Sequence, residues 1–139
     1  MSKSLKSLLS FVIYVAVLLS IVYFTPKILA AVLGTPYPIA AITSSSMWPA
    51  LKQGDLVLIK NVKQNQLKIG DIIVYKNEQG FTIHRIVRLN KENLITKGDA
   101  NNVEDKPVDY KEVIGRVVNI GDKPFRIPFL GKIAILIRK

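Results

Sequence analysis

An uncharged run of 18 residues, 7–24, constrains most strongly how this chain can fold. As a helix it would extend about 27 Å, near the thickness of the hydrocarbon layer of a bilayer. Lys3 and Lys6 precede the run and Lys27 follows it, so charged side chains flank both of its ends. The run predicts one transmembrane helix over 7–24, and the apolar residues 28–33 leave open a continuation to residue 33.

A retained anchor and a cleavable signal peptide are the two interpretations of this run. The basic start suits both, but the apolar core exceeds the 7–15 residues usual in signal peptides. Thr25, Pro26 and Lys27 also interrupt it before any small-residue cleavage site. We therefore expect an anchor in residues 1–35, with a cytoplasmic N-terminus and residues 36–139 on the other side of the membrane.

About 100 residues remain after the anchor, enough for one small hydrophobic core. Their composition limits the chemistry that they can perform. The chain has no cysteine and one histidine, which excludes thiol catalysis, disulfides and multi-histidine metal sites, and we expect no cofactor. The net charge is +10, but the basic residues are spread along the chain and interleaved with acidic ones. They do not form the dense basic cluster that nucleic-acid binding requires. Only after Asp122 are basic residues uncompensated, so we expect segment 126–139 to lie at the membrane interface.

The part of the chain after Pro36 has the pattern of β structure. Short runs rich in Val, Ile, Tyr and Thr alternate with Gly-Asp and Asn-rich turn signals, and no long helical period occurs. These runs predict a mainly β domain with strands at 39–43, 56–60, 72–76, 81–89, 94–97 and 113–120.

Ser46 and His84 are the candidate nucleophile and base. Ser46 begins a Ser-Met-x-Pro sequence just beyond the expected anchor, and a serine hydroxyl needs a base to become nucleophilic. His84 lies within the predicted strand 81–89, and no lysine occupies an obviously apolar strand as a Ser-Lys pair would require. Taken singly, Ser46 could be a turn residue and His84 a surface or core residue, since neither face of its strand is purely apolar.

Four segments in this order resemble the ordered boxes of type I signal peptidases. They are Ser44-x-Ser46-Met47-x-Pro49, Gly70-Asp71-Ile72-Ile73-Val74-Tyr75, Ile83-His84-Arg85-Ile86-Val87 and Lys97-Gly98-Asp99-x-Asn101-Asn102-x-x-Asp105. Bacterial members typically have a lysine before the arginine, where this chain has His84. The chain therefore resembles the endoplasmic-reticulum and archaeal branch, as does its tail, residues 127–133.

The resemblance implies a compact, barrel-like β domain and a role for each matching residue. Ser46 matches the nucleophile, His84 the base, and Asp105 the acid that orients the base. Asp99 matches a second acidic position, where a supporting role and a plain turn residue stay open. Ser44 matches a position that helps to bind the oxyanion. The family commonly has glycine at position 45, and a positive φ there would strain Ser45.

The implied function is the removal of N-terminal signal peptides from exported preproteins after small residues, in an Ala-x-Ala-like pattern. The implied partners are preprotein signal peptides and the lipid bilayer, with a translocon or accessory subunits left open. The location would be the cell membrane, or the endoplasmic reticulum membrane in a eukaryote. Two rivals remain: a self-cleaving Ser-Lys regulator, and a catalytically silent anchored β module that binds lipid or a secretion partner.

Overall fold

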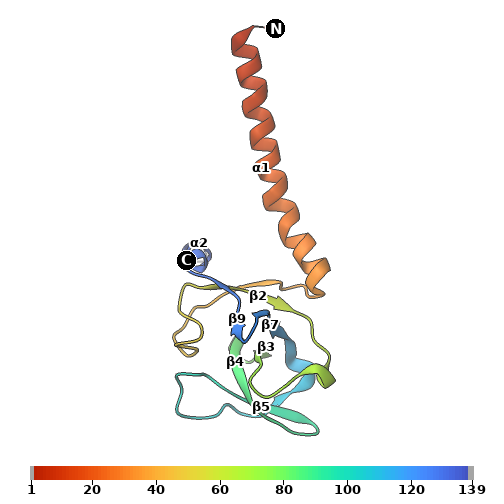
Figure 1. Cartoon of the computed structure of the whole chain (residues 1–139), viewed down its shortest axis with the longest axis vertical. Coiled ribbons are helices and arrows are strands. Elements are labelled where there is room, and N and C mark those ends of the chain that lie inside the picture. The colour runs from red at the N-terminus through yellow and green to blue at the C-terminus, as the bar shows by residue number, and fades with distance from the viewer. Residues whose placement is uncertain (1, 138–139) are drawn as a thin grey trace.

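A computed structural model describes residues 2–137 and shows a long helix standing away from a β domain (Figure 1). The helix, α1, spans Lys3–Leu33. The Ser2 hydroxyl accepts a hydrogen bond from the Leu5 amide and so caps its start. Gly34 ends it in the left-handed conformation, with φ at 65°, which glycine adopts without strain.

An apolar helix occurs where the sequence predicts the transmembrane helix, and it is longer than the run 7–24. Because Pro26 interrupts only one turn, the helix continues through it to Leu33, the continuation that the sequence left open. Among the described residues, α1 alone is long and apolar enough to cross a membrane, and no residue of its most apolar stretch is buried. The Asn61 amide donates to the Leu33 carbonyl at 2.8 Å, which ties the end of the helix to the β domain.

The β domain is built from one large antiparallel sheet and a small hairpin. Its strand order is β1-β2-β7-β3-β4-β5-β6, β10 also pairs with β2, and β8 pairs with β9. The bounds are β1 Ile39–Ala41, β2 Leu56–Lys60, β3 Ile72–Asn77, β4 Gly80–Leu89, β5 Asn93–Lys97, β6 Val108–Asp109, β7 Val113–Val117, β8 Asn119–Ile120, β9 Lys123–Pro124 and β10 Arg126–Ile127. Two short 3₁₀ helices, η1 Gln64–Gln66 and η2 Tyr110–Glu112, precede β3 and β7.

The mainly β prediction is confirmed, and all six predicted strands occur. The run 113–120 divides into β7 and β8, while β6, β9 and β10 lack the length to produce a pattern in the sequence. The barrel-like shape is not confirmed: within residues 2–137 no ladder joins β6 to β1 or β10, so the sheet stays open.

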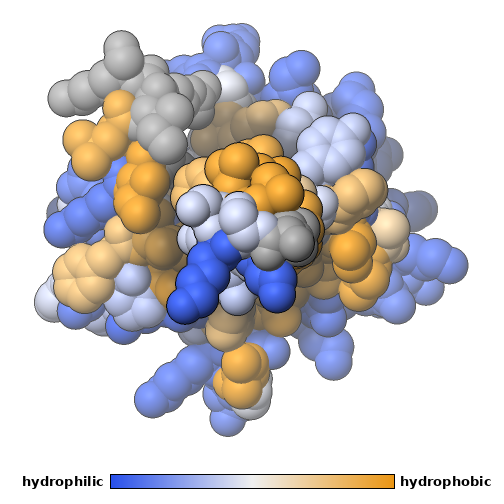
Figure 2. Space-filling model, turned by 90° about the horizontal axis from the view of Figure 1, so that it is seen from above, coloured by the Kyte–Doolittle hydropathy of each residue, from blue (hydrophilic) through white to orange (hydrophobic). Residues whose placement is uncertain are grey.

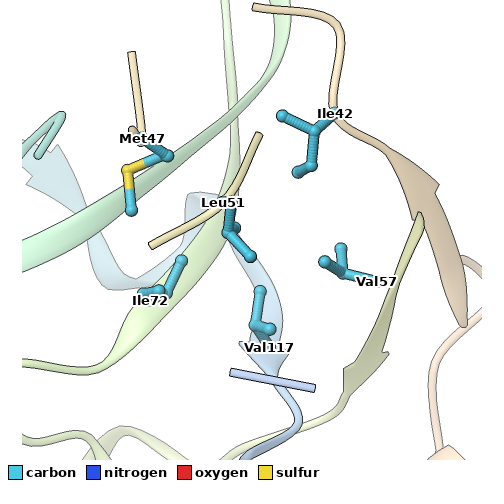
Figure 3. Packing of buried hydrophobic residues seen from close by; sticks show 6 residues of the cluster. All are labelled: Ile42, Met47, Leu51, Val57, Ile72 and Val117. Carbon is cyan, nitrogen blue, oxygen red and sulfur yellow. The ribbon is translucent and has the colours of Figure 1, made fainter. Parts of the chain in front are cut away.

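Two buried clusters hold the domain together. One contains Ile42, Met47, Leu51, Val57, Ile72 and Val117, whose side chains converge in Figure 3. The other contains Leu67, Ile73, Tyr75, Ile86, Leu94 and Val108. Neighbouring residues of β3 point into different clusters because side chains alternate along a strand. The sheet is therefore covered by apolar packing on both of its faces.

The C-terminal segment docks on the domain at the end from which α1 rises. It forms a helix, α2 (Leu130–Ile137), which the sequence analysis did not predict because eight residues hold only two turns. A Cβ at Gly131 would lie 2.5 Å from the Asp55 carbonyl oxygen, so only glycine allows this close packing. Arg138 and Lys139, which belong to the predicted interfacial segment 126–139, lie outside the described residues.

Candidate active site

Ser46 lies in a tight turn after β1 and is half-buried. The next residue, Met47, is only 1% exposed and packs beside Leu51 in the first cluster (Figure 3). The Leu51 amide donates to the Met47 carbonyl at 2.9 Å, and the Trp48 amide donates to the Ser45 carbonyl at 3.0 Å. Because burial of Met47 anchors the turn, the backbone that carries the Ser46 hydroxyl has a defined position.

The loop after β5 presses against the backbone of Ser46. The Ala100 amide donates to the Ser46 carbonyl at 2.8 Å. A Cβ at Gly98 would lie 2.7 Å from the same carbonyl oxygen, which is closer than real Cβ atoms approach. Glycine at position 98 therefore lets this loop, which carries both candidate aspartates, reach the candidate nucleophile.

His84 connects Ser46 to Asp105 through its two ring nitrogens. It is a buried residue of β4, opposite Ile73 of β3. Its Nε2 lies 3.1 Å from the Ser46 Oγ, and its Nδ1 lies 2.6 Å from Asp105 Oδ2. Since a carboxylate only accepts, Nδ1 carries the proton and donates to Asp105, which leaves Nε2 of the neutral ring free to accept the Ser46 proton.

Asp105 is held by more than His84. Its amide donates to the Thr96 carbonyl at 2.8 Å, which fixes its backbone against the end of β5. Its Oδ2 also accepts from the Thr96 hydroxyl at 2.7 Å and from the Tyr75 hydroxyl at 3.3 Å. Burial, with a smaller contribution from the charge of Asp105, raises the pKa of Tyr75, so this phenol stays protonated as a donor.

Asp99 contacts Arg85 rather than His84. Both carboxylate oxygens accept from the guanidinium, from Nε and Nη2, at 2.7 Å each. Arg85 Nη1 also donates to the Gly70 carbonyl at 2.7 Å. The hydrogen bonds from Arg85 to Asp99 raise the pKa of Arg85 above its ordinary value. This bidentate pair links the loop after β5 to β4.

Ser44 lies beside Ser46 on the exposed side of the turn. The two hydroxyl oxygens are 3.1 Å apart. Among residues 2–137, Phe129 is the one non-glycine residue with a positive φ, so Ser45 has an ordinary backbone conformation. The serine in place of the family's usual glycine therefore causes no strain in this turn.

Ser44, Ser46 and His84 open onto a groove of about 1060 Å³. Its walls are mostly apolar and include Ile39 and Ala41 of β1, Phe81 and Ile83 of β4, and Ile135 of α2. Sequence reasoning missed Ile135, Tyr75, Thr96 and the role of Arg85, because their contacts with the site come from distant segments. The described residues hold no group of three or more His, Cys, Asp or Glu side chains that could bind a metal ion.

Comparison with known proteins places most of the chain in a known family. Residues 23–118 match the model of the family described as Peptidase S24-like. The catalytic subunit SEC11 of the signal peptidase complex of Lodderomyces elongisporus is 39% identical over 106 residues, which cover 69% of this chain and 63% of that protein. SEC11 of Metarhizium acridum is 36% identical over 111 residues, 69% of this chain and 61% of that protein.

The human relative is more distant. Signal peptidase complex catalytic subunit SEC11C of Homo sapiens is 27% identical over 110 residues, which cover 68% of this chain and 54% of that protein. The matched part of this chain thus spans between about half and two thirds of the length of these relatives. They confirm the resemblance to the endoplasmic-reticulum type of signal peptidase. Because the matching family model covers most of the chain, the chain belongs to the Peptidase S24-like family.

Proposed function

We propose that this protein is a membrane-anchored serine endopeptidase that removes N-terminal signal peptides from exported preproteins. The observation that supports it best is the hydrogen-bonded series Ser46–His84–Asp105 at the edge of an apolar groove. A neutral imidazole between a hydroxyl and a carboxylate is the arrangement that activates serine for acyl transfer.

Each residue of the series has a defined step in the proposed reaction. The Ser46 oxygen attacks the carbonyl carbon of the scissile peptide bond while His84 Nε2 takes the hydroxyl proton. The C–N bond then breaks, the leaving amine takes that proton from the imidazolium, and the acyl group remains on Ser46. His84 next takes a proton from water, whose oxygen attacks the acyl carbon. The bond from that carbon to Ser46 then breaks, and the imidazolium gives the proton to the departing Ser46 oxygen, which restores the free enzyme. Asp105 orients the ring and stabilises its charged form throughout.

The oxyanion of the tetrahedral intermediate needs donors close to Ser46. We assign this role to the Ser46 amide and the Ser44 hydroxyl, which lies 3.1 Å from the Ser46 hydroxyl and is exposed toward the groove. Removing one such donor typically costs a factor of about 100 to 1,000 in kcat. Asp99 acts indirectly in this proposal, by holding the loop that contacts the Ser46 carbonyl.

The proposed substrates follow from the groove and from the anchor. Extended peptide can lie along β1 and β4, whose apolar residues line the same groove as Ser46, and cleavage would follow small side chains in an Ala-x-Ala-like pattern. The anchor is α1, and the interfacial segment is 126–139. Exposed apolar residues gather around the base of α1 in Figure 2, on the face that would meet the bilayer. The relatives' names refer to a complex, so accessory subunits are proposed as partners.

The orientation of the anchor can be tested separately from the activity. Lys3 and Lys6 would keep the N-terminus cytoplasmic, and the β domain would lie on the extracytoplasmic or lumenal side. Since the chain has no cysteine, the variant Gln79→Cys places a single thiol on an exposed turn. A membrane-impermeant thiol reagent should label it in intact cells or spheroplasts. Labelling only after permeabilisation would reverse the proposed orientation.

The deciding experiment is cleavage of a preprotein by the purified full chain in detergent. We expect a single cut after a small residue at the end of the signal peptide, and no cut by Ser46→Ala. A silent β module would bind without cutting, and a self-cleaving regulator would cut its own chain instead. Mass spectrometry of the products distinguishes these outcomes and gives the residues on both sides of the cut.

A further inference from the structure

The carboxylate of Asp105 is the meeting point of three strands. One oxygen, Oδ2, accepts from His84 of β4 at 2.6 Å, from the Thr96 hydroxyl of β5 at 2.7 Å and from the Tyr75 hydroxyl of β3 at 3.3 Å. Hydrogen bonds to a carboxylate are stronger than those between neutral groups. The hydroxyls of Thr96 and Tyr75 thus bind the same oxygen, Oδ2 of Asp105, that accepts the hydrogen bond from His84.

The two hydroxyl donors are buried, whereas Asp105 is not. Thr96 is 0% exposed and Tyr75 is 4% exposed, while the Asp105 side chain keeps 22% of its surface. An ionised carboxylate with access to water gains solvation when it turns outward. The hydroxyls of Thr96 and Tyr75 offset that gain, because they offer Asp105 hydrogen bonds on its inner side.

Among the described residues, no lysine or arginine side chain forms an ion pair with Asp105. Arg85, on the other face of β4, is occupied by Asp99, and Arg88 pairs with Glu104 at 3.1 Å. Asp105 has His84 as its one ion-pair partner in residues 2–137. Asp105 is thus the titratable group in hydrogen-bond contact with the His84 ring, and Tyr75 contacts the same carboxylate. The negative charge of Asp105 stays directed at the imidazole instead of being neutralised.

We propose that Thr96 and Tyr75 are positioning residues, which hold the Asp105 carboxylate against His84 in the orientation that the base requires. Thr96 carries the larger share because its hydrogen bond is shorter and because its backbone carbonyl also accepts from the Asp105 amide. This inference rests on the proposed function for its catalytic meaning. The orientation itself can be measured without any activity.

The test uses isosteric variants of the full chain in detergent micelles. Thr96→Val removes the hydroxyl and keeps the shape, Thr96→Ser restores the hydroxyl, and Tyr75→Phe removes the second donor. Tyr110→Phe is the matched control, since the Tyr110 hydroxyl donates to the Asn90 carbonyl away from the site. His84 is the sole histidine of the chain, so its ring protons are unambiguous in an NMR titration.

We expect Thr96→Val to lower kcat about 10- to 100-fold with KM unchanged, the scale of one hydrogen bond to a charged group. With Asp105 turned outward, the imidazolium loses its partner, so the midpoint of the His84 titration should move to lower pH. Tyr75→Phe should shift the midpoint in the same direction by less. Thr96→Ser should restore kcat and the midpoint, and Tyr110→Phe should change neither.

The outcomes separate this inference from the proposed function. If the wild type cleaves preprotein but the His84 midpoint in the Thr96→Val variant is unchanged or higher, the positioning role is overturned and the proposed function stands. A lowered midpoint in a protein that never cleaves preprotein supports the positioning role and removes the function. Should Thr96→Val fail to fold, an unchanged midpoint in Tyr75→Phe is the result that overturns the inference.

Discussion

Asp99 and Asp105 belong to one loop, yet they contact two different, adjacent residues of β4. Asp105 contacts His84, and Asp99 forms a bidentate pair with Arg85. Successive side chains of a strand point to opposite faces, so His84 and Arg85 draw the two carboxylates to opposite sides of the sheet. One carboxylate meets a titratable ring and the other meets a permanent cation.

The partner decides what each carboxylate can do. Arg85 stays charged at any working pH, so Asp99 is neutralised by a fixed partner and its pair acts as a clamp on the loop. His84 changes its charge during the proposed reaction, so Asp105 can stabilise a charge that appears only then. We therefore expect the two carboxylates of this loop to differ: the Asp99 pair should affect stability, and the Asp105 pair should affect the rate of the proposed reaction.

The largest effect is expected from replacing Ser46, and it tests whether this residue is the nucleophile of the proposed cleavage. Ser46→Ala should lower kcat by about four to six orders of magnitude while the protein stays folded, because it removes the nucleophile. Ser45→Ala is the matched control and should cost less than about tenfold, since its side chain is exposed. Cleavage rates of a preprotein measure both. Equal losses would mean that the nucleophile is misassigned.

His84→Ala should come next and abolish measurable cleavage, because no other described side chain contacts the Ser46 hydroxyl as a base could. In the wild type, kcat/KM should fall as the pH is lowered. The reason is that only the neutral ring accepts the serine proton. A His84→Ala enzyme that keeps substantial activity and the same acid limb would assign the base to a lysine.

Asp105→Asn and Asp99→Asn set the two carboxylates against each other directly. Asp105→Asn should lower kcat about 100-fold or more and move the acid limb to lower pH, since a neutral amide no longer favours the imidazolium. Asp99→Asn should leave that limb in place and lower the free energy of unfolding by about 1–3 kcal/mol, because Arg85 loses a charged partner. pH–rate profiles and denaturant unfolding in detergent measure the two effects. If both variants shift the acid limb equally, the division into rate and stability is wrong.

The smallest expected effect concerns a region that contacts neither aspartate. Ile133 of α2 is 57% exposed and lies in the segment proposed to meet the bilayer. Ile133→Glu should slow cleavage of a membrane-embedded preprotein severalfold and leave a soluble peptide unaffected, because a charge weakens binding to the interface. Ile69→Glu, at a similarly exposed site before β3, is the matched control. Equal losses on both substrates would make α2 part of the site itself, which it borders through Ile135.

Local patterns in the sequence predicted much of this protein. The uncharged run 7–24 predicted α1, since length and hydrophobicity are properties of consecutive residues. Alternating β-branched residues between turn signals predicted the strands. The motifs around Ser46 and His84 indicated the family, which the comparisons confirm, because motif residues are close in sequence.

Only the tertiary structure decided which side chains meet. The family resemblance predicted Asp105 as the partner of His84, but the local sequence pattern alone does not separate the two aspartates of this loop. Which of them reaches His84 depends on the register of β4 against β5 and on the path of the loop. Tyr75, Thr96 and Ile135 come to the site from three separate elements, and nothing local marks them. Strand pairing brings His84 to a serine 38 residues away, because the free energy that fixes such contacts comes from burying the whole core, which no short segment encodes.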